Sequence, residues 1–178
     1  EPKLALVYNS QQGNGLLGVG WSLSGLSSIS RCPATIAVDG ARSAINFGGS
    51  EFCWNGQRLI AKTTSGSQDS GTDIFGAYWE FRTELESFAR IRAYASLTSP
   101  GFFKIWTNDG RVLSFGATSD SNVSPQSKGT LIWALNREED RKGNYLTVTY
   151  GTTADDSEYY PATIQYGGVT GLGTRSVA

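Results

Sequence analysis

A glycine-rich run near the start of the chain has the residue types of a dinucleotide-binding turn. Residues 13–18 read GNGLLG, which matches the pattern G-x-G-x-x-G, and a strand-like run at 4–8 precedes them. Asp39 follows Gly18 by 21 residues, the spacing at which such folds place the carboxylate that binds a ribose hydroxyl. The candidate chemistry is therefore the binding of a nicotinamide-type cofactor.

The residues after this run argue against a nucleotide site. A pyrophosphate needs the N-terminus of a helix directly after the glycines. Gly20 and Gly25 each disfavour a helix by about 1 kcal/mol relative to alanine, and Trp21 and Leu23 indicate an extended segment. We interpret residues 13–20 as a loop between two extended segments, closed by burial of Trp21. No helix follows this loop and it holds no phosphate site.

A second candidate is the E-x-E motif of Glu84 and Glu86. ADP-ribosyltransferases hold the nicotinamide ribose with a glutamate pair of this form. That chemistry also needs an upstream arginine and a Ser-Thr-Ser strand, which residues 27–30 (SSIS) match poorly. E-x-E occurs often by chance on the solvent side of strands, so we do not interpret it as catalytic.

Clustered acids form a third candidate, for acid–base chemistry or for calcium. Their spacing is not that of a calcium-binding loop, and they lie in turn-like sequence. We predict that they are solvated and that the chain has no catalytic, cofactor or metal site. The residues are Asp155 with Asp156, and Glu138 with Glu139 and Asp140.

The absence of histidine excludes Ser-His-Asp and Cys-His catalysis within the chain. The two cysteines, Cys32 and Cys53, cannot form a zinc site alone. They could form one disulfide, but a single pair is no disulfide framework, and two buried free thiols are the favoured interpretation.

Several aromatic side chains could instead stack on sugar rings. Tryptophan more often fills the core of a β-protein because it buries a large area. A glycan-binding surface therefore stays as an alternative. The residues concerned are Trp54, Trp79, Trp106 and Trp133.

Composition favours one globular β-rich domain. The 178 residues are 39% hydrophobic and 17% charged, with 22 glycines and a net charge of −1. This charge gives no electrostatic signal for nucleic acid or an anionic membrane, and no apolar run reaches the ~18 residues of a membrane span. The chain starts abruptly in a strand without methionine, so we expect an excised or mature piece of a larger protein.

Short alternating runs locate the expected strands. Asp109-Gly110 predicts a hairpin between 105–107 and 111–115, because Asp-Gly supplies the positive φ angles of a tight turn. Residues 145–150 and 162–166 are strand-like, and 78–94 is interpreted as strand, irregular break and strand. We expect loops at 63–72, 117–129 and 136–143, and a fraying tail at 167–178. The predicted fold is all-β, with antiparallel meander or sandwich-like sheets, long Ser/Gly-rich loops and little or no helix.

Several short motifs occur in a fixed order along the chain. They are 2–10, 13–15, 17–23, 29–31, 52–59, 82–91, 109–110, 115–116, 133–135, 143–145 and 160–166. Together they resemble the SpvB-type N-terminal module, which opens the Salmonella plasmid virulence protein and the B component of tripartite insecticidal (Tc) toxins and is related to Rhs/YD-repeat proteins. One departure is Trp54-Asn55, where the family usually has Leu-Asp.

The resemblance implies a non-enzymatic module of a secreted bacterial toxin-type protein. In the relatives such modules belong to a hollow shell around a toxic C-terminal polypeptide, and catalysis resides in a separate effector. The implied partners are other segments of the same shell or a toxin C component; a glycan or host surface is the alternative, and an enzyme associated with ADP-ribosyl transfer comes third. We expect one module over 1–178, with an N-terminal part at 1–95, YD-like hairpin strands at 96–167 and a tail at 168–178.

Overall fold

The computed structural model describes residues 4–10, 14–15, 18–19, 21–40, 42–125, 128–152, 159–168 and 175–177. Within these ranges the chain is almost entirely strand, with one helical turn, α1 (Ile36–Asp39), and one 3-10 turn, η1 (Ser119–Ser121). The all-β prediction is confirmed. The strands are β1 (Ala5–Tyr8), β2 (Asn14–Gly15), β3 (Gly18–Val19), β4 (Trp21–Ser24), β5 (Ser28–Arg31), β6 (Phe52–Trp54), β7 (Gln57–Ala61), β8 (Thr63–Thr64), β9 (Ser67–Gln68), β10 (Ser70–Asp73), β11 (Gly76–Thr83), β12 (Arg90–Tyr94), β13 (Phe102–Trp106), β14 (Val112–Phe115), β15 (Asn122–Val123), β16 (Ile132–Glu139), β17 (Tyr145–Thr152), β18 (Tyr159–Gly168) and β19 (Arg175–Val177).

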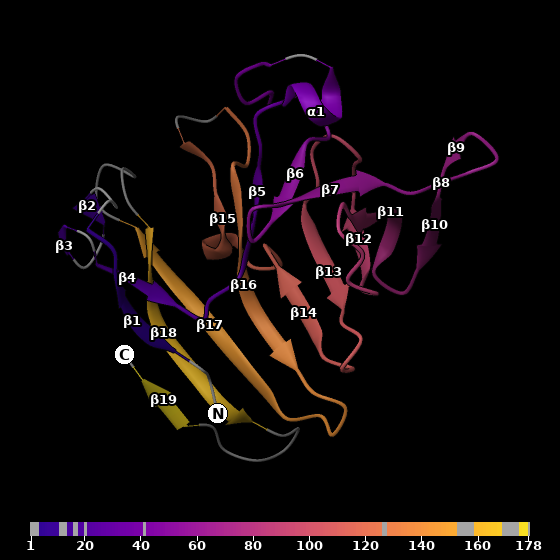
Figure 1. Ribbon diagram of the computed structural model, residues 1–178. Helices are drawn as coiled ribbons and strands as arrows, with labels where there is room; N and C mark the ends of the chain where they lie inside the picture. Colours follow the sequence, from indigo (N-terminus) through magenta and orange to yellow (C-terminus); the bar gives the residue numbers. More distant parts are fainter. Residues whose placement is uncertain are drawn as a thin grey trace.

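The main sheet closes on itself as a barrel. Strands β14, β13, β12, β11, β7, β6, β5 and β16 are hydrogen-bonded in this order, all antiparallel, and β16 pairs with β14 again. The ring combines strands from both halves of the chain (Figure 1). Closure gives each ring strand a partner on both sides, which removes the open edges that a flat sheet would leave. The sequence prediction of sandwich-like sheets did not include this closure.

Aromatic side chains fill the inside of the barrel. Strand residues alternate between the two faces of a sheet, so Phe103 and Ile105 of β13 are both fully buried. Phe52, Phe103 and Trp133 pack edge to face, with ring centroids 5.1 to 5.4 Å apart. This edge-to-face geometry is the favoured one for aromatic pairs. The remaining core residues are Ile29, Leu59, Phe81, Ile91, Ala93, Leu113, Phe115 and Leu135.

Arg31 lies at one end of this core, where its neighbours on other strands are apolar. Its side chain is buried, and its guanidinium stands 5.2 Å from the ring centroid of Phe52 and 5.5 Å from that of Trp133. Burial lowers the pKa of Arg31, and the nearby Glu51 carboxylate opposes this shift. A charge in such a place must have its donors satisfied, because an unpaired buried charge is very costly.

Backbone carbonyl groups satisfy the Arg31 guanidinium. Nε donates to Thr130 O at 2.9 Å, Nη2 to Thr98 O at 2.7 Å, and Nη1 to Gly49 O at 2.8 Å and Asn46 O at 3.3 Å. These acceptors belong to three separate connections, β5–β6, β12–β13 and β15–β16. One side chain therefore ties together the loops that cover this end of the barrel.

Strand β16 is the branch point of the sheet. Residues 132–134 pair with β5 and residues 137–139 pair with β17, so two strands share one β16 edge in succession. Beyond that point β17, β18 and β19 form an extension outside the ring. Figure 1 shows this extension at the lower left of the barrel.

Several predicted strands and turns are confirmed. Gly110 has φ +82° in the hairpin between β13 and β14, as the Asp-Gly pair requires. Residues 78–94 form the end of β11, an irregular break and β12. Runs 145–150 and 162–166 lie in β17 and β18.

Four loop or tail predictions are wrong in part. The Ser/Gly-rich run 63–72 contains strands β8, β9 and most of β10, and the run 117–129 contains η1 and β15. Residues 136–139 belong to β16, so only 140–143 form the expected charged turn. In the tail, 167–168 end β18 and 175–177 form β19, while 169–174 and 178 lie outside the described residues. Backbone pairing with a neighbouring strand overrides a weak local preference in each case.

The expectation of two free thiols is also wrong. Cys32 and Cys53 form a disulfide, with their Cα atoms 5.8 Å apart. The pairing of β5 with β6 places Ser30 opposite Cys53 and so brings Cys32 within reach. This register is a tertiary feature that two isolated cysteines in a sequence do not reveal.

We predict that the double variant C32S/C53S loses about 3 kcal/mol of unfolding free energy, because the bond closes a loop of 21 residues in the unfolded chain. Urea unfolding with and without reductant measures this loss. Reductant should lower the stability of the wild type and leave the double variant unchanged. Alkylation and mass measurement without reductant should find no free thiol in the wild type.

We predict that Arg31→Leu lowers the unfolding free energy by about 3 kcal/mol or more, because buried carbonyl groups lose their donor. Arg31→Lys keeps the charge but not the planar fork of donors, so its loss should be intermediate. Urea unfolding followed by tryptophan fluorescence measures both. A leucine variant as stable as the wild type would show that the loops close without this side chain.

Candidate interaction surface

The glycine-rich run lies in a strand region. Asn14–Gly15 pair with Gly18–Val19 in a short hairpin, and β4 follows, so no helix succeeds the glycines. The extended segments on both sides of the run are confirmed, whereas the loop prediction for 13–20 is wrong in part, because β2 and β3 lie inside it. Asp39, the candidate ribose-binding acid, instead forms an ion pair with Arg58 of β7 at 2.6 Å. Gly13, Leu16, Leu17 and Gly20 lie outside the described residues, as does the Trp21 side chain.

The residues proposed for an ADP-ribosyltransferase site do not converge. Glu84 lines a pocket of about 710 Å³ beside the disulfide, whereas Glu86 lines another pocket of about 490 Å³ beside Arg90. The Ser27 hydroxyl group accepts a hydrogen bond from Trp54 Nε1 and donates one to Asn55 Oδ1, so it serves the β6–β7 turn.

The acidic residues at 138–140 have structural partners. Glu138 pairs with Arg111 at 2.7 Å, and Glu139 pairs with Arg137 at 2.8 Å. Asp140 accepts backbone hydrogen bonds in the β16–β17 turn. No group of three potential ligands that could hold a metal ion occurs among the residues with described positions. Asp155 and Asp156 lie outside them.

The four tryptophans do not line one open groove. Trp133 is fully buried and donates from Nε1 to Pro100 O, while Trp54 and Trp79 pack against the core. Trp106 is half-buried on the outer wall, 5.6 Å from the Arg92 guanidinium. Their main role in this structure is to fill and flank the barrel.

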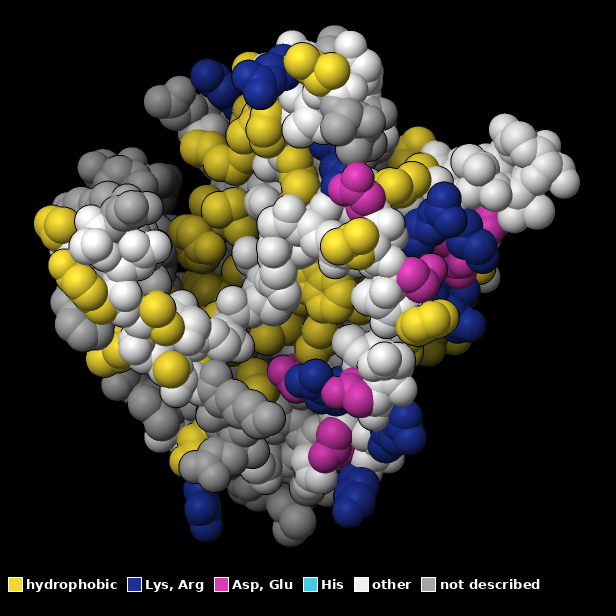
Figure 2. All heavy atoms as spheres, in the orientation of Figure 1, with side chains coloured by type: hydrophobic (Ala, Val, Ile, Leu, Met, Phe, Trp, Pro, Cys, Tyr) yellow, Lys and Arg dark blue, Asp and Glu magenta, His cyan; other side chains and the backbone are white. Residues whose placement is uncertain are grey.

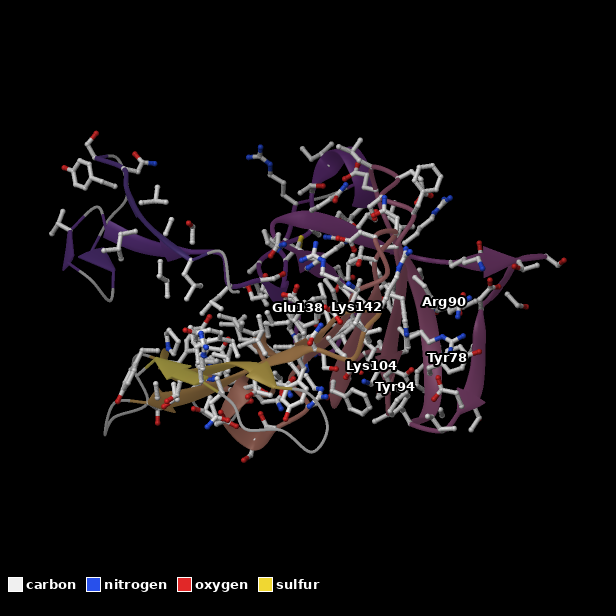
Figure 3. All side chains as sticks on the ribbon, turned by 90° about the horizontal axis from the view of Figure 1, so that it is seen from below. Tyr78, Arg90, Tyr94, Lys104, Glu138 and Lys142 are labelled. Atoms are coloured by element: carbon white, nitrogen blue, oxygen red, sulfur yellow. A yellow bond between two sulfur atoms is a disulfide. The ribbon has the colours of Figure 1, made fainter. Side chains whose placement is uncertain are left out.

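An N-terminal ribbon carries several exposed apolar side chains. Strands β1 and β4 pair antiparallel, Tyr8 opposite Trp21, and within the described residues neither pairs with a strand of the barrel. On β1, Leu6 is 63% exposed, Val7 43% and Tyr8 57%, so both faces of the strand carry exposed apolar side chains. Figure 3 shows the ribbon standing away from the β17–β19 extension, and Figure 2 shows hydrophobic side chains on its outer surface at the left.

A polar network covers the outer wall of β10–β13 instead. Arg92 donates to Asp73 at 2.7 Å and to Glu80 at 2.9 Å, and the Tyr94 hydroxyl donates to Asp73 at 2.9 Å. Tyr94 also stacks on Phe102, with ring centroids 4.6 Å apart. Burial and the neighbouring Asp73 both raise the pKa of Tyr94. This network neutralises Arg92 and joins β10 to β11 and β12 through Asp73 and Glu80.

Lys104 borders this network and has no ion-pair partner among the described residues. Its Nζ donates to Ser114 Oγ at 3.1 Å and lies 4.2 Å from the ring centroid of Phe75. Burial lowers the pKa of Lys104, and the positive charge of Arg137 adds to the effect. Tyr78, Tyr94 and Lys104 lie on the same side of the strands in Figure 3.

Most of the chain matches the model of a known protein family. A family model described as Salmonella virulence plasmid 65kDa B protein, SpvB, matches residues 1–167. No curated protein matches the chain. No helix within the described residues is long and apolar enough to span a membrane.

Solved structures show the same fold. The N-terminal domain of the effector protein SpvB from Salmonella typhimurium strain LT2 is similar, with a TM-score of 0.76 and 23% identity over 93% of this chain and 59% of that one. The complex TcdB2-TccC3-Cdc42 is similar with a TM-score of 0.71 and 20% identity, over 93% of this chain and 9% of that one. The Photorhabdus luminescens Tc holotoxin pore is similar with a TM-score of 0.71 and 21% identity, over 93% of this chain and 8% of that one. The chain thus spans little more than half the length of the SpvB domain and a small part of the toxin chains.

We predict that Asp73 makes stability fall in acid. Burial alone would raise its pKa, but hydrogen bonds from the Phe75 backbone, Tyr94 and Arg92 outweigh this and hold the pKa below its usual value. A lowered folded-state pKa contributes stability above about pH 4, which is lost as the pH falls through the folded value. Asp73→Asn should therefore be less stable at pH 7 and show a shallower decline between pH 5 and 3 in urea unfolding. An unchanged slope would contradict the assignment.

Proposed function

The chain belongs to the SpvB family, and from this premise we propose that it is a non-enzymatic structural module of a bacterial toxin-type protein. Its role is to form one segment of a larger β-rich shell by pairing with neighbouring segments. The observation that carries the proposal is the β1–β4 ribbon, which exposes Leu6, Val7 and Tyr8 although the chain has a complete barrel core of its own.

Physical chemistry favours a covered ribbon in the functional state. A two-stranded ribbon is marginally stable by itself, and exposed apolar patches mark places where another protein surface packs. Strands β10 and β19 each have one partner strand among the described residues, so their outer edges can accept another strand. The apolar ribbon and these open edges together suit association through both side chains and backbone.

The partners we propose are further segments of the same polypeptide and a toxin C component. The similar TcdB2-TccC3 structures support this, because in them the matching region is about a tenth of a much longer chain. On the same basis we propose a secreted toxin component, with residues 1–178 as one module that includes YD-like hairpin strands. Two observations support a module without catalysis. Glu84 and Glu86 line different pockets, and Ser27, Glu138 and Asp140 have structural hydrogen-bond or ion-pair partners.

Hydrogen exchange tests the covering of the ribbon. We predict that backbone amides of 5–8 and 21–24 exchange at least about tenfold more slowly in the complete natural polypeptide than in residues 1–178 alone, because covering strands must open first. Leu6→Ser should reduce this protection. Ile74→Ser is the matched control, since Ile74 is 91% exposed on the distant β10–β11 turn. Equal exchange in both proteins would refute the proposed role.

A further inference from the structure

Two arginines beside the end of the β11–β12 pairing have no acidic partner among the described residues. The printed pairing ends with Phe81 opposite Ile91, and the adjacent residues Arg82 and Arg90 both line one pocket. Both side chains are exposed, and no described residue forms an ion pair or side-chain hydrogen bond with either. Two like charges that share a pocket repel each other, so this arrangement does not stabilise the fold.

A strained loop presents an aromatic ring beside these arginines. Phe88 has φ +54°, a left-handed conformation that bulky residues rarely adopt, and its side chain is 79% exposed. Glu86 Oε1 accepts a hydrogen bond from the Phe88 backbone N–H at 2.7 Å, and the hydroxyls of Thr83 and Ser87 are 2.8 Å apart. The loop is therefore held in place while it displays Phe88 to solvent. Such strain persists where the surrounding structure enforces it, often at binding sites.

The arginines and Phe88 line one pocket of about 490 Å³. Lys62 and Glu80 also line it, 3.3 Å apart, and both belong to a larger ion-pair network, Lys62 with Asp69 at 3.1 Å and Glu80 with Arg92 at 2.9 Å. Glu86 is the remaining acid in the lining, and one of its oxygens is bound to the loop backbone. The pocket thus keeps one net positive charge with two guanidinium groups available to a ligand. Arg90 is labelled on the barrel wall in Figure 3.

We propose that this pocket binds a carboxylate side chain of an acidic peptide segment, with a neighbouring apolar residue of that segment packed on Phe88. The planar donors of arginine match a carboxylate in a bidentate geometry. The excess of a single positive charge suits one carboxylate, whereas a doubly charged phosphate would also face the carboxylates of Glu80 and Glu86. The prearranged loop reduces the entropy lost on binding. The site lies apart from the ribbon and does not depend on the shell role.

The test is a nuclear magnetic resonance titration of the isotopically labelled chain. The probes are the capped peptide acetyl-Glu-Phe-amide, its uncharged counterpart acetyl-Gln-Phe-amide, and inorganic phosphate, all at equal ionic strength. We expect saturable shifts of the Arg82 and Arg90 Nε–H signals and of the Phe88 amide with the acidic peptide. The uncharged peptide and phosphate should bind at least tenfold more weakly.

Variants separate this site from general charge effects. Arg82→Gln and Arg90→Gln should each weaken binding of the acidic peptide about tenfold or more, and Arg82→Lys should weaken it as well. Arg42→Gln removes an exposed arginine elsewhere and should leave binding unchanged. Phe88→Gly relieves the left-handed strain, so it should fold and still bind more weakly. Equal binding of both peptides, tighter binding of phosphate, or an unchanged affinity of both Arg→Gln variants would overturn the proposal.

Discussion

The barrel depends on the satisfaction of one buried guanidinium. Arg31 lies among Phe52 and Trp133, and its donors reach carbonyl groups of three separate connections. Its burial and the closure of the loops require each other: the loops supply the acceptors, and the arginine supplies donors for carbonyls that would otherwise be unsatisfied in a buried place. The disulfide between Cys32 and Cys53 strengthens the same region, since it joins the two ends of the β5–β6 connection that contributes Asn46 and Gly49.

Closure of the ring determines which surfaces remain for association. Aromatic side chains fill the inside of the barrel, so three of the four tryptophans considered for sugar stacking, Trp54, Trp79 and Trp133, belong to the core or pack against it. Three features of the described chain lie outside the ring: the branch at β16, the edge strand β10 and the β1–β4 ribbon. Strand β16 sends the sheet in two directions, β10 projects from β11, and β1 pairs only with β4 among the strands that the structure describes. The chain therefore combines a self-sufficient core with elements that are incomplete by themselves, a combination typical of a module in a larger assembly.

Sequence reasoning used one hairpin turn signal of the chain and passed over two others. Asp109-Gly110 correctly indicated a hairpin. The same kind of signal at Asn55-Gly56 and Ser65-Gly66 marks the turns β6–β7 and β8–β9, where Asn55 and Ser65 have positive φ. The Ser65-Gly66 pair could have identified β8 and β9 within 63–72, and the Asn55-Gly56 pair could have identified β6 and β7. The two pocket arginines could not be found in this way, because Arg82 and Arg90 line the same pocket only once β11 and β12 are paired.

The sequence by itself determined the all-β class, the family and the extended segments on both sides of the glycine motif. These follow from local properties: alternation of side chains, turn-forming pairs, and glycines with no helix-forming residues after them. The tertiary structure alone decided the closure of the barrel, the disulfide and the placement of Arg31 among carbonyl groups. Each of these depends on contacts between residues distant in the chain, such as Arg31 with Thr130. A local sequence pattern does not specify which distant residues come into contact.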